Sequence, residues 1–225
     1  MEVQILYEDN HLLAVNKPAG MLTQGDDTGD YSLVDAVNDY LVKKYNKPGA
    51  AFVGLIHRID RPVSGLVLFA KTSKALERMN KLFHDREVQK KYLAVVKEKV
   101  IMEEGTLVNY LKKNTDKNLV HAHDREVRDS KRAELSYRVQ KHGGKTSLLE
   151  VSPKTGRPHQ IRVQLSHMGH PIVGDVKYGY PTPNEDHSIA LHSWKLAFEH
   201  PVTKEPIQLR CPVPDKPWWR LLKEQ

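Results

Sequence analysis

Residues 57–70 read His57-Arg58-Ile59-Asp60-Arg61-Pro62-Val63-Ser64-Gly65, followed directly by Leu66-Val67-Leu68-Phe69-Ala70. Pro62 fixes one backbone angle and Gly65 frees another, so we expect a sharp bend that leads into a buried strand. A turn at the end of such a strand can hold a polar side chain in one geometry over a rigid platform. Asp60 is therefore either a residue that closes the turn or a functional carboxylate that the turn presents.

The composition around this stretch is that of a basic globular protein. The chain has 225 residues, with 35 Lys and Arg against 28 Asp and Glu, which gives a net charge of +7. That length suffices for a sizeable hydrophobic core. A basic globular protein favours polyanionic partners, with nucleic acid first and an anionic membrane surface second.

No signal for export or membrane insertion is present in the sequence. No apolar run approaches the roughly 18 residues that a membrane span needs, and Met1 to Gln4 lack the features of a signal peptide. The single cysteine, Cys211, excludes an internal disulfide framework. We therefore expect a cytoplasmic protein.

Strands dominate the pattern, and helices are inserted singly. Strands are predicted at residues 3–7, 11–15, 66–71, 87–96, 106–111, 119–122, 133–139, 147–151, 189–198 and 207–211, with Gly143-Gly144 as a hairpin turn. Helices are predicted after an N-cap at Ser32, after an N-cap at Ser73, and over residues 158–168 with Pro158 near the first helical position; residues 218–222 form a closing turn or helix. This order favours an α+β fold, with a central mixed, largely antiparallel sheet flanked by helices, in a single domain over residues 1–225.

A second basic stretch, Lys154 to Gln164, reads KTGRPHQIRVQ. Gly156 and Pro158 mark a loop that enters a helix, where backbone N–H groups and the positive helix end face outward. Cationic and hydrogen-bonding side chains lie at the start of this predicted helix, namely those of Arg157, His159 and Arg162. They form either a solvated basic helix or a site for RNA phosphate and one buried ion pair.

The stretch HRIDRPVSGLVLFAK resembles the signature H-R-L-D-x-x-T-S-G-L of RluA-type RNA pseudouridine synthases. Other stretches are similar to the same family in the same order: Asn16 to Gly20, Lys91 to Val95, Gly156 to Val163, Gly169 to Asp175 with Tyr178-Gly179, and Leu191-His192 through Phe198 to His200-Pro201. Ile59 stands in place of the usual Leu, and Val63 in place of Thr, so a hydroxyl that could tie the turn is absent. Because the resemblance begins within the first twenty residues, we expect the catalytic domain alone, without the N-terminal S4 domain frequent in the family.

The resemblance implies a pseudouridine-synthase-like fold and isomerisation of uridine to pseudouridine in RNA, without a metal or organic cofactor. Asp60 matches the catalytic aspartate, acting as nucleophile at C1′ or as base at C2′. Arg162 matches the arginine that opposes its charge, because desolvation disfavours an unpaired carboxylate. Tyr92 matches the tyrosine that stacks on the target base.

The partner implied is rRNA or tRNA, bound by a monomer with no membrane association. The target nucleotide must be flipped out of its stack before its C1′ and C5 can be reached. Residues expected to hold flanking RNA are Arg58, Arg61, Lys90, Lys91, Arg157, His159 and Gln160.

Parts of the sequence are also compatible with a metal site, a glycosidase or a non-catalytic RNA-binding protein. His121 and His123 share a strand face and could chelate a metal, but no second close pair completes a four-ligand set. A glycosidase needs two carboxylates around the bond, and the stretch around Asp60 supplies arginines instead. A non-catalytic RNA-binding protein would explain the charge equally well, although it gives no reason for an aspartate among cations.

Overall fold

The computed structural model describes residues 3–222, so Met1 and Glu2, at the start of the N-terminal stretch considered above, lie outside it. The chain divides into two compact units. Unit 1 comprises residues 1–89 and 192–213, and unit 2 comprises residues 90–191 and 214–225. Because two compact units can form one domain, the single domain over residues 1–225 stays a prediction.

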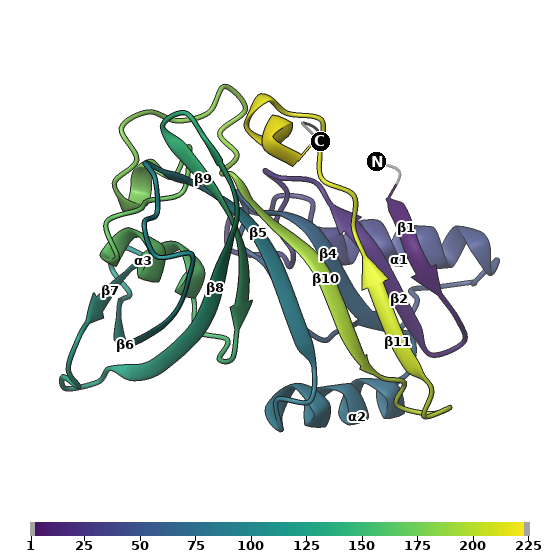
Figure 1. The fold of residues 1–225 in the computed structure, drawn as a ribbon. Helices are drawn as coiled ribbons and strands as arrows, with labels where there is room; N and C mark the ends of the chain where they lie inside the picture. The colour runs from purple at the N-terminus through teal and green to yellow at the C-terminus, as the bar shows by residue number, and fades with distance from the viewer. Residues whose placement is uncertain (1–2, 223–225) are drawn as a thin grey trace. The chain divides into compact units, whose positions relative to one another are not determined.

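Unit 1 is built on a mixed sheet whose strands run side by side in Figure 1. In spatial order these are β1 (Gln4–Glu8), β2 (Leu12–Lys17), β4 (Ser64–Ala70), β10 (Leu191–Glu199) and β11 (Pro206–Arg210), with the short β3 (Gly54–Leu55) beside β4. β4 and β10 pair in parallel, through Ser64 with His192 and Gly65 with Ser193. The other pairings described within unit 1 are antiparallel. Every residue of β4 is buried, as its unbroken apolar run predicts.

Two helices belong to unit 1. α1 (Leu33–Lys44) begins at the predicted N-cap Ser32, which forms a capping box with Asp35. α2 (Ser73–His84) packs Ala75 and Met79 against alternate residues of β2 and β4, in a core that also includes Leu196 and Leu209. The sheet of unit 1 therefore rests on a packed helix, which gives the turn before β4 a rigid base.

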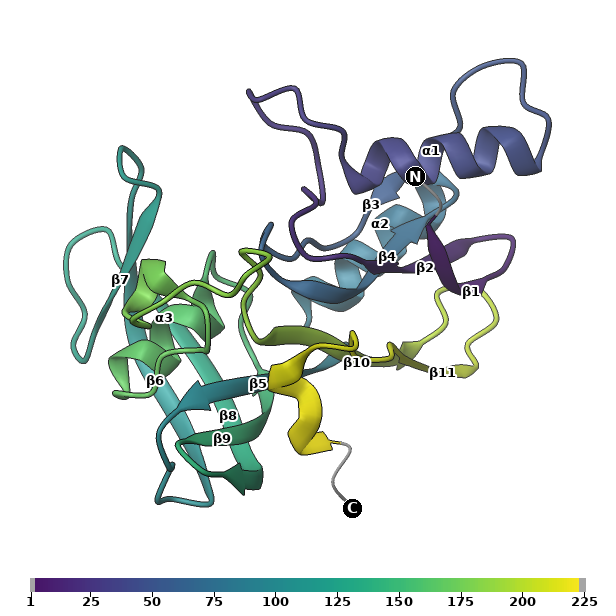
Figure 2. The same cartoon turned by 90° about the horizontal axis from the view of Figure 1, so that it is seen from above.

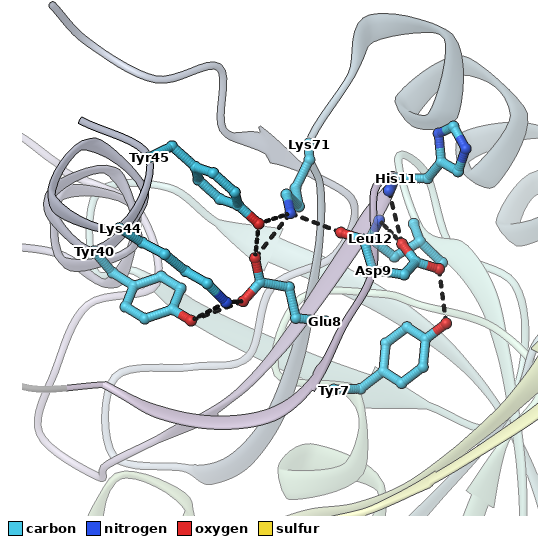
Figure 3. Close-up of polar contacts among 9 residues, drawn as sticks. All are labelled: Tyr7, Glu8, Asp9, His11, Leu12, Tyr40, Lys44, Tyr45 and Lys71. Carbon is cyan, nitrogen blue, oxygen red and sulfur yellow. Dashed lines mark hydrogen bonds and ion pairs between the residues drawn. The ribbon is translucent and has the colours of Figure 1, made fainter. Parts of the chain in front are cut away.

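The C-terminal end of α1 is held by a charged network around Glu8, shown in Figure 3. The Glu8 carboxylate accepts hydrogen bonds from Tyr40, Lys44, Tyr45 and Lys71 at 2.7–2.8 Å. Burial raises the pKa of Glu8, but these donors together lower it to about 2. The network thus ties α1, the end of β1 and the residue after β4 together with an ionised carboxylate.

Unit 2 is built on a sheet of antiparallel strands. In spatial order these are β5 (Gln89–Lys97), β9 (Thr146–Pro153), β8 (Lys131–Gly143), β6 (Glu104–Asn114) and β7 (Leu119–His123). α3 (Gln160–His167) lies alongside β6 and β7 in Figure 2. Val163 and Tyr178 pack there against Leu111, Val120 and Ala133. The 3-10 helices η1 (Val176–Tyr178) and η2 (Pro217–Leu222) complete the unit.

The α+β class and the mixed sheet are confirmed, and two helix starts were wrong. Thr72, rather than Ser73, is the N-cap of α2, because its hydroxyl accepts the N–H of Ala75. α3 begins after His159, so Pro158 lies before the helix. β3 and η1 were not expected from the sequence, since both are too short to show a periodic spacing of apolar residues. Among residues 3–222, no helix is both long and apolar enough to cross a membrane.

Candidate active site

Asp60 lies in the loop that joins β3 to β4, in unit 1. The N–H of Val63 donates to the carbonyl of Asp60 at 3.0 Å, which closes the turn that Pro62 predicts. Asp60 is half-buried, whereas its neighbours Arg58 and Arg61 are exposed. The turn therefore holds one carboxylate above the buried strand β4.

The segment that follows β2 wraps around this turn. Gly20 donates its N–H to the carbonyl of Arg61 at 2.8 Å, and the Nε of Arg61 donates back to the carbonyl of Gly20 at 3.0 Å. The Nη1 of Arg61 also forms an exposed ion pair with Asp30 at 2.9 Å. Arg61 is thus engaged on both its backbone and its side chain.

Lys17 is fully buried beneath the turn. Its Nζ donates to the carbonyls of Pro18, Met21 and Arg61 at 3.0, 2.7 and 3.2 Å. Burial lowers the pKa of Lys17 to about 7, while the negative charge of Asp60 opposes that shift. The buried amino group of Lys17 therefore binds the backbone of the turn, including the carbonyl of Arg61 next to Asp60.

The other end of the turn is anchored on β10. Gly65 has φ +117°, and a Cβ at this position would collide with the backbone of Ser193, so only glycine allows this close approach. The Nε2 of His192 lies 3.4 Å from the carbonyl of Cys211 and must donate to it, so its Nδ1 accepts the Ser64 hydroxyl at 2.9 Å. Burial lowers the pKa of His192 to about 4, which keeps this arrangement neutral at physiological pH.

Arg162 lies on α3 in unit 2, where its side chain is buried. Its Nε and Nη2 donate to the two carboxylate oxygens of Asp175 at 2.7 and 2.9 Å, in a bidentate pair. The guanidinium also lies over the ring of Tyr178, 5.0 Å from its centroid. Asp175 thereby fixes one edge of the guanidinium, and the ring of Tyr178 fixes one of its faces.

His159 precedes α3 with φ +53°, in the left-handed region. Its Nδ1 lies 2.7 Å from the hydroxyl of Tyr178, which also accepts the N–H of Val120 at 3.1 Å. His159 therefore joins the start of α3 to η1 and β7. Its backbone conformation is one that non-glycine residues adopt at a cost, typically where surrounding contacts demand it.

A family model described as RNA pseudouridylate synthase matches residues 11–167. The chain belongs to this family. It is 33% identical to ribosomal large subunit pseudouridine synthase C of Vibrio vulnificus, over 93% of this chain and 65% of that protein. It is also 33% identical to tRNA pseudouridine synthase C of Pasteurella multocida, over 99% of this chain and 96% of that protein.

A solved structure agrees with the assignment. The human RNA pseudouridylate synthase domain containing 1 has a TM-score of 0.77 and 26% sequence identity, over 96% of this chain and 85% of that one. The fold and family that the motifs imply are therefore confirmed. The chain spans 65% of the length of the Vibrio ribosomal relative.

The candidate residues fall into two groups in this member of the pseudouridylate synthase family. Arg58, Asp60 and Arg61 share one turn of unit 1. In unit 2, Lys90, Lys91 and Tyr92 lie on β5, and Arg157, His159, Gln160 and Arg162 gather at the start of α3.

The candidates of unit 2 differ in how far their side chains are already engaged by other residues of that unit. Lys91 pairs with Glu150 at 2.6 Å. Gln160 is buried, and its amide bonds Thr155, the N–H of Arg157 and the carbonyl of Glu134. Gln160 therefore shapes the loop before α3, whereas the side chain of Arg157 is half-exposed.

Several residues that contact the candidates within each unit were not singled out from the sequence. Lys17, Asp175, Tyr178 and His192 occur in stretches that resemble the family, but their residue types gave no sign of burial or pairing. Lysine in particular is almost never fully buried. Among residues 3–222, no cluster of three or more His, Cys, Asp or Glu residues could hold a metal ion.

Proposed function

We propose that this protein converts uridine to pseudouridine within an RNA chain. The observation that carries the proposal is a half-buried carboxylate, Asp60, held by hydrogen bonds on both sides of its turn, in a chain of the pseudouridylate synthase family. In the proposed reaction the bond between C1′ and N1 breaks, and C1′ forms a bond to C5. N1 gains a proton, and the hydrogen of C5 is released.

Asp60 is proposed to act on the ribose, as nucleophile at C1′ or as base at C2′. Its turn, fixed by Lys17 and Gly20, supports this role because a reacting group must be held in one geometry. Arg162 is proposed as the counter-ion of Asp60, for which its buried fork with Asp175 supplies a fixed orientation.

RNA binding is proposed to depend mainly on unit 2. The residue ranges of unit 2 contain 21 Lys and Arg against 14 Asp and Glu, whereas those of unit 1 contain 14 of each. The whole net charge of +7 thus belongs to unit 2. A basic body of this kind attracts the phosphate backbone without reading sequence. The relatives named for rRNA and for tRNA support either RNA as substrate.

The experiment that tests the function is tritium release from RNA labelled at C5 of uridine. The substrate is total RNA from a strain without the gene, so that target uridines are unmodified. Catalytic release of tritium supports the proposal. Tight RNA binding with no release from rRNA or tRNA favours the non-catalytic RNA-binding protein instead.

Replacing Tyr92 by phenylalanine tests whether its hydroxyl takes part in removing the C5 proton. Phenylalanine keeps the ring that is proposed to stack on the base, so the affinity for RNA should equal that of the wild type. If the hydroxyl moves the proton, tritium release falls about a hundredfold, the lower range for a positioned acid or base. The matched control is Tyr110→Phe on β6, which should retain activity. Full activity of Tyr92→Phe excludes the hydroxyl from proton removal.

Salt dependence of RNA affinity tests the role of Arg157. Its Nε donates to the carbonyl of Arg132 at 3.1 Å, which leaves the Nη groups for a phosphate. In titrations of a uridine-free RNA stem-loop, Arg157→Ala should reduce the slope of log affinity against log salt by about one. Lys74→Ala, an exposed lysine of α2 in unit 1, should leave the slope unchanged. Identical slopes for the wild type and Arg157→Ala would show that Arg157 does not contact an RNA phosphate.

A further inference from the structure

Residues 60–63, which form the turn that carries Asp60, contain no side-chain hydroxyl. Val63 is buried and apolar where the family signature has threonine. A hydroxyl nevertheless reaches the turn from elsewhere in unit 1. The side chain of Thr23, buried and 36 residues away in sequence, donates to the carbonyl of Ile59 at 2.7 Å.

The contact between Thr23 and Ile59 is reciprocal. The N–H of Ile59 lies 3.4 Å from the same Thr23 hydroxyl oxygen. One side chain therefore satisfies both backbone groups of the residue directly before Asp60, and Ile59 itself is buried. A hydroxyl can do this because it donates once and accepts through two lone pairs.

Thr23 is itself fixed by the start of α1. The first N–H groups of a helix have no partner within it. Here Leu33 donates its N–H to the carbonyl of Leu22 at 2.8 Å, and Val34 donates to that of Thr23 at 3.2 Å. The capping box of Ser32 and Asp35 holds this end of the helix in place.

These contacts form a continuous path from a capped helix to Ile59, the residue directly before Asp60. We propose that Thr23 is a positioning residue, which fixes the backbone at Ile59 and thereby the direction of the Asp60 side chain. Thr23 supplies from a distant segment the hydroxyl that Val63 does not. The inference rests on the proposed function, because it assumes that Asp60 reacts.

The test is the pair of variants Thr23→Val and Thr23→Ser. Valine keeps the shape of threonine and removes both hydrogen bonds, whereas serine keeps the hydroxyl. Thr23→Val should lower kcat, per folded molecule, by about tenfold to a hundredfold, the effect expected of a small misplacement of a reacting group. KM for the RNA should stay within about twofold, and Thr23→Ser should restore most of kcat, because only the orientation of Asp60 changes.

Thr72→Val is the matched control. It removes a threonine hydroxyl that also bonds backbone in unit 1, at the N-cap of α2. It should lower Tm without changing kcat. An unchanged kcat in Thr23→Val, a Thr23→Ser variant as slow as Thr23→Val, or an equal loss of kcat in Thr72→Val would each overturn the role of Thr23.

A second readout does not depend on activity. Amide hydrogen exchange of residues 57–63 should become faster in Thr23→Val, while exchange in α1 stays as in the wild type. Unchanged exchange in this turn contradicts the positioning role. Faster exchange in a protein whose wild type releases no tritium would instead show that the turn is held as inferred and that the proposed function is wrong.

Discussion

Replacing Asp60 by asparagine is expected to abolish the release of tritium from RNA labelled at C5 of uridine. Asparagine has nearly the shape of aspartate and does not disturb the hydrogen bond between Val63 and the carbonyl of residue 60. It removes the negative charge and the nucleophilic or basic oxygen. A loss of at least about a thousandfold is expected, within the range for removing a positioned reacting group.

The controls for Asp60→Asn separate chemistry from folding and binding. Asp27→Asn makes the same chemical change in an exposed loop of unit 1 and should retain full activity. Affinity for RNA should be retained in Asp60→Asn, because the net charge that attracts RNA belongs to unit 2. If Asp60→Asn releases tritium as fast as the wild type, Asp60 does not take part in the reaction.

Replacing Arg162 by lysine should produce the second largest effect. Lysine keeps the positive charge but loses the planar fork that Nε and Nη2 form with Asp175. A single ammonium cannot bind both carboxylate oxygens of Asp175 in one plane, so it loses the fixed orientation that the proposed counter-ion role of Arg162 requires. We expect tritium release per folded molecule to fall by about a hundredfold, the scale on which one preorganised donor contributes. RNA affinity should change by less than about threefold, because the charge is preserved.

The matched control for this variant is Arg138→Lys on β8. Arg138 donates through Nε and Nη2 to one oxygen of Glu104, Oε2, but both side chains are mostly exposed, and exposed pairs contribute little. Its activity should match that of the wild type. Thermal unfolding of Arg162→Lys shows how much folded protein each assay contains. Equal losses of RNA affinity and activity would contradict a role for Arg162 specific to the reaction.

Local chemistry explains what could be predicted of the fold. The run Leu66–Ala70 predicts a buried strand, and β4 is buried throughout. The Ser32 and Asp35 spacing predicts a helix start, and both hydrogen bonds of the capping box form. The start of α2 was misplaced by one residue because Thr72 and Ser73 are both good N-caps. Only the backbone conformation of Thr72 decides between them.

The candidate site could be predicted only in part. Asp60 is a carboxylate in a short stretch of unusual composition, and Arg162 and Tyr92 are found through the family resemblance. The partners of these residues carry no comparable signal. Asp175 follows a glycine in a loop without any regular spacing of apolar residues. Nothing in its neighbours indicates a buried ion pair with Arg162 on α3.

The sequence by itself determined that a sharp turn presents Asp60 at the start of a buried strand, because proline, glycine and an apolar run act on their own neighbours. Only the tertiary structure decided that Lys17 is buried beneath that turn and that the hydroxyl of Thr23 binds Ile59. These contacts join segments distant in the chain, and their geometry depends on strand register and helix packing. A lysine or a threonine is most often exposed to solvent, so its residue type does not reveal such a role.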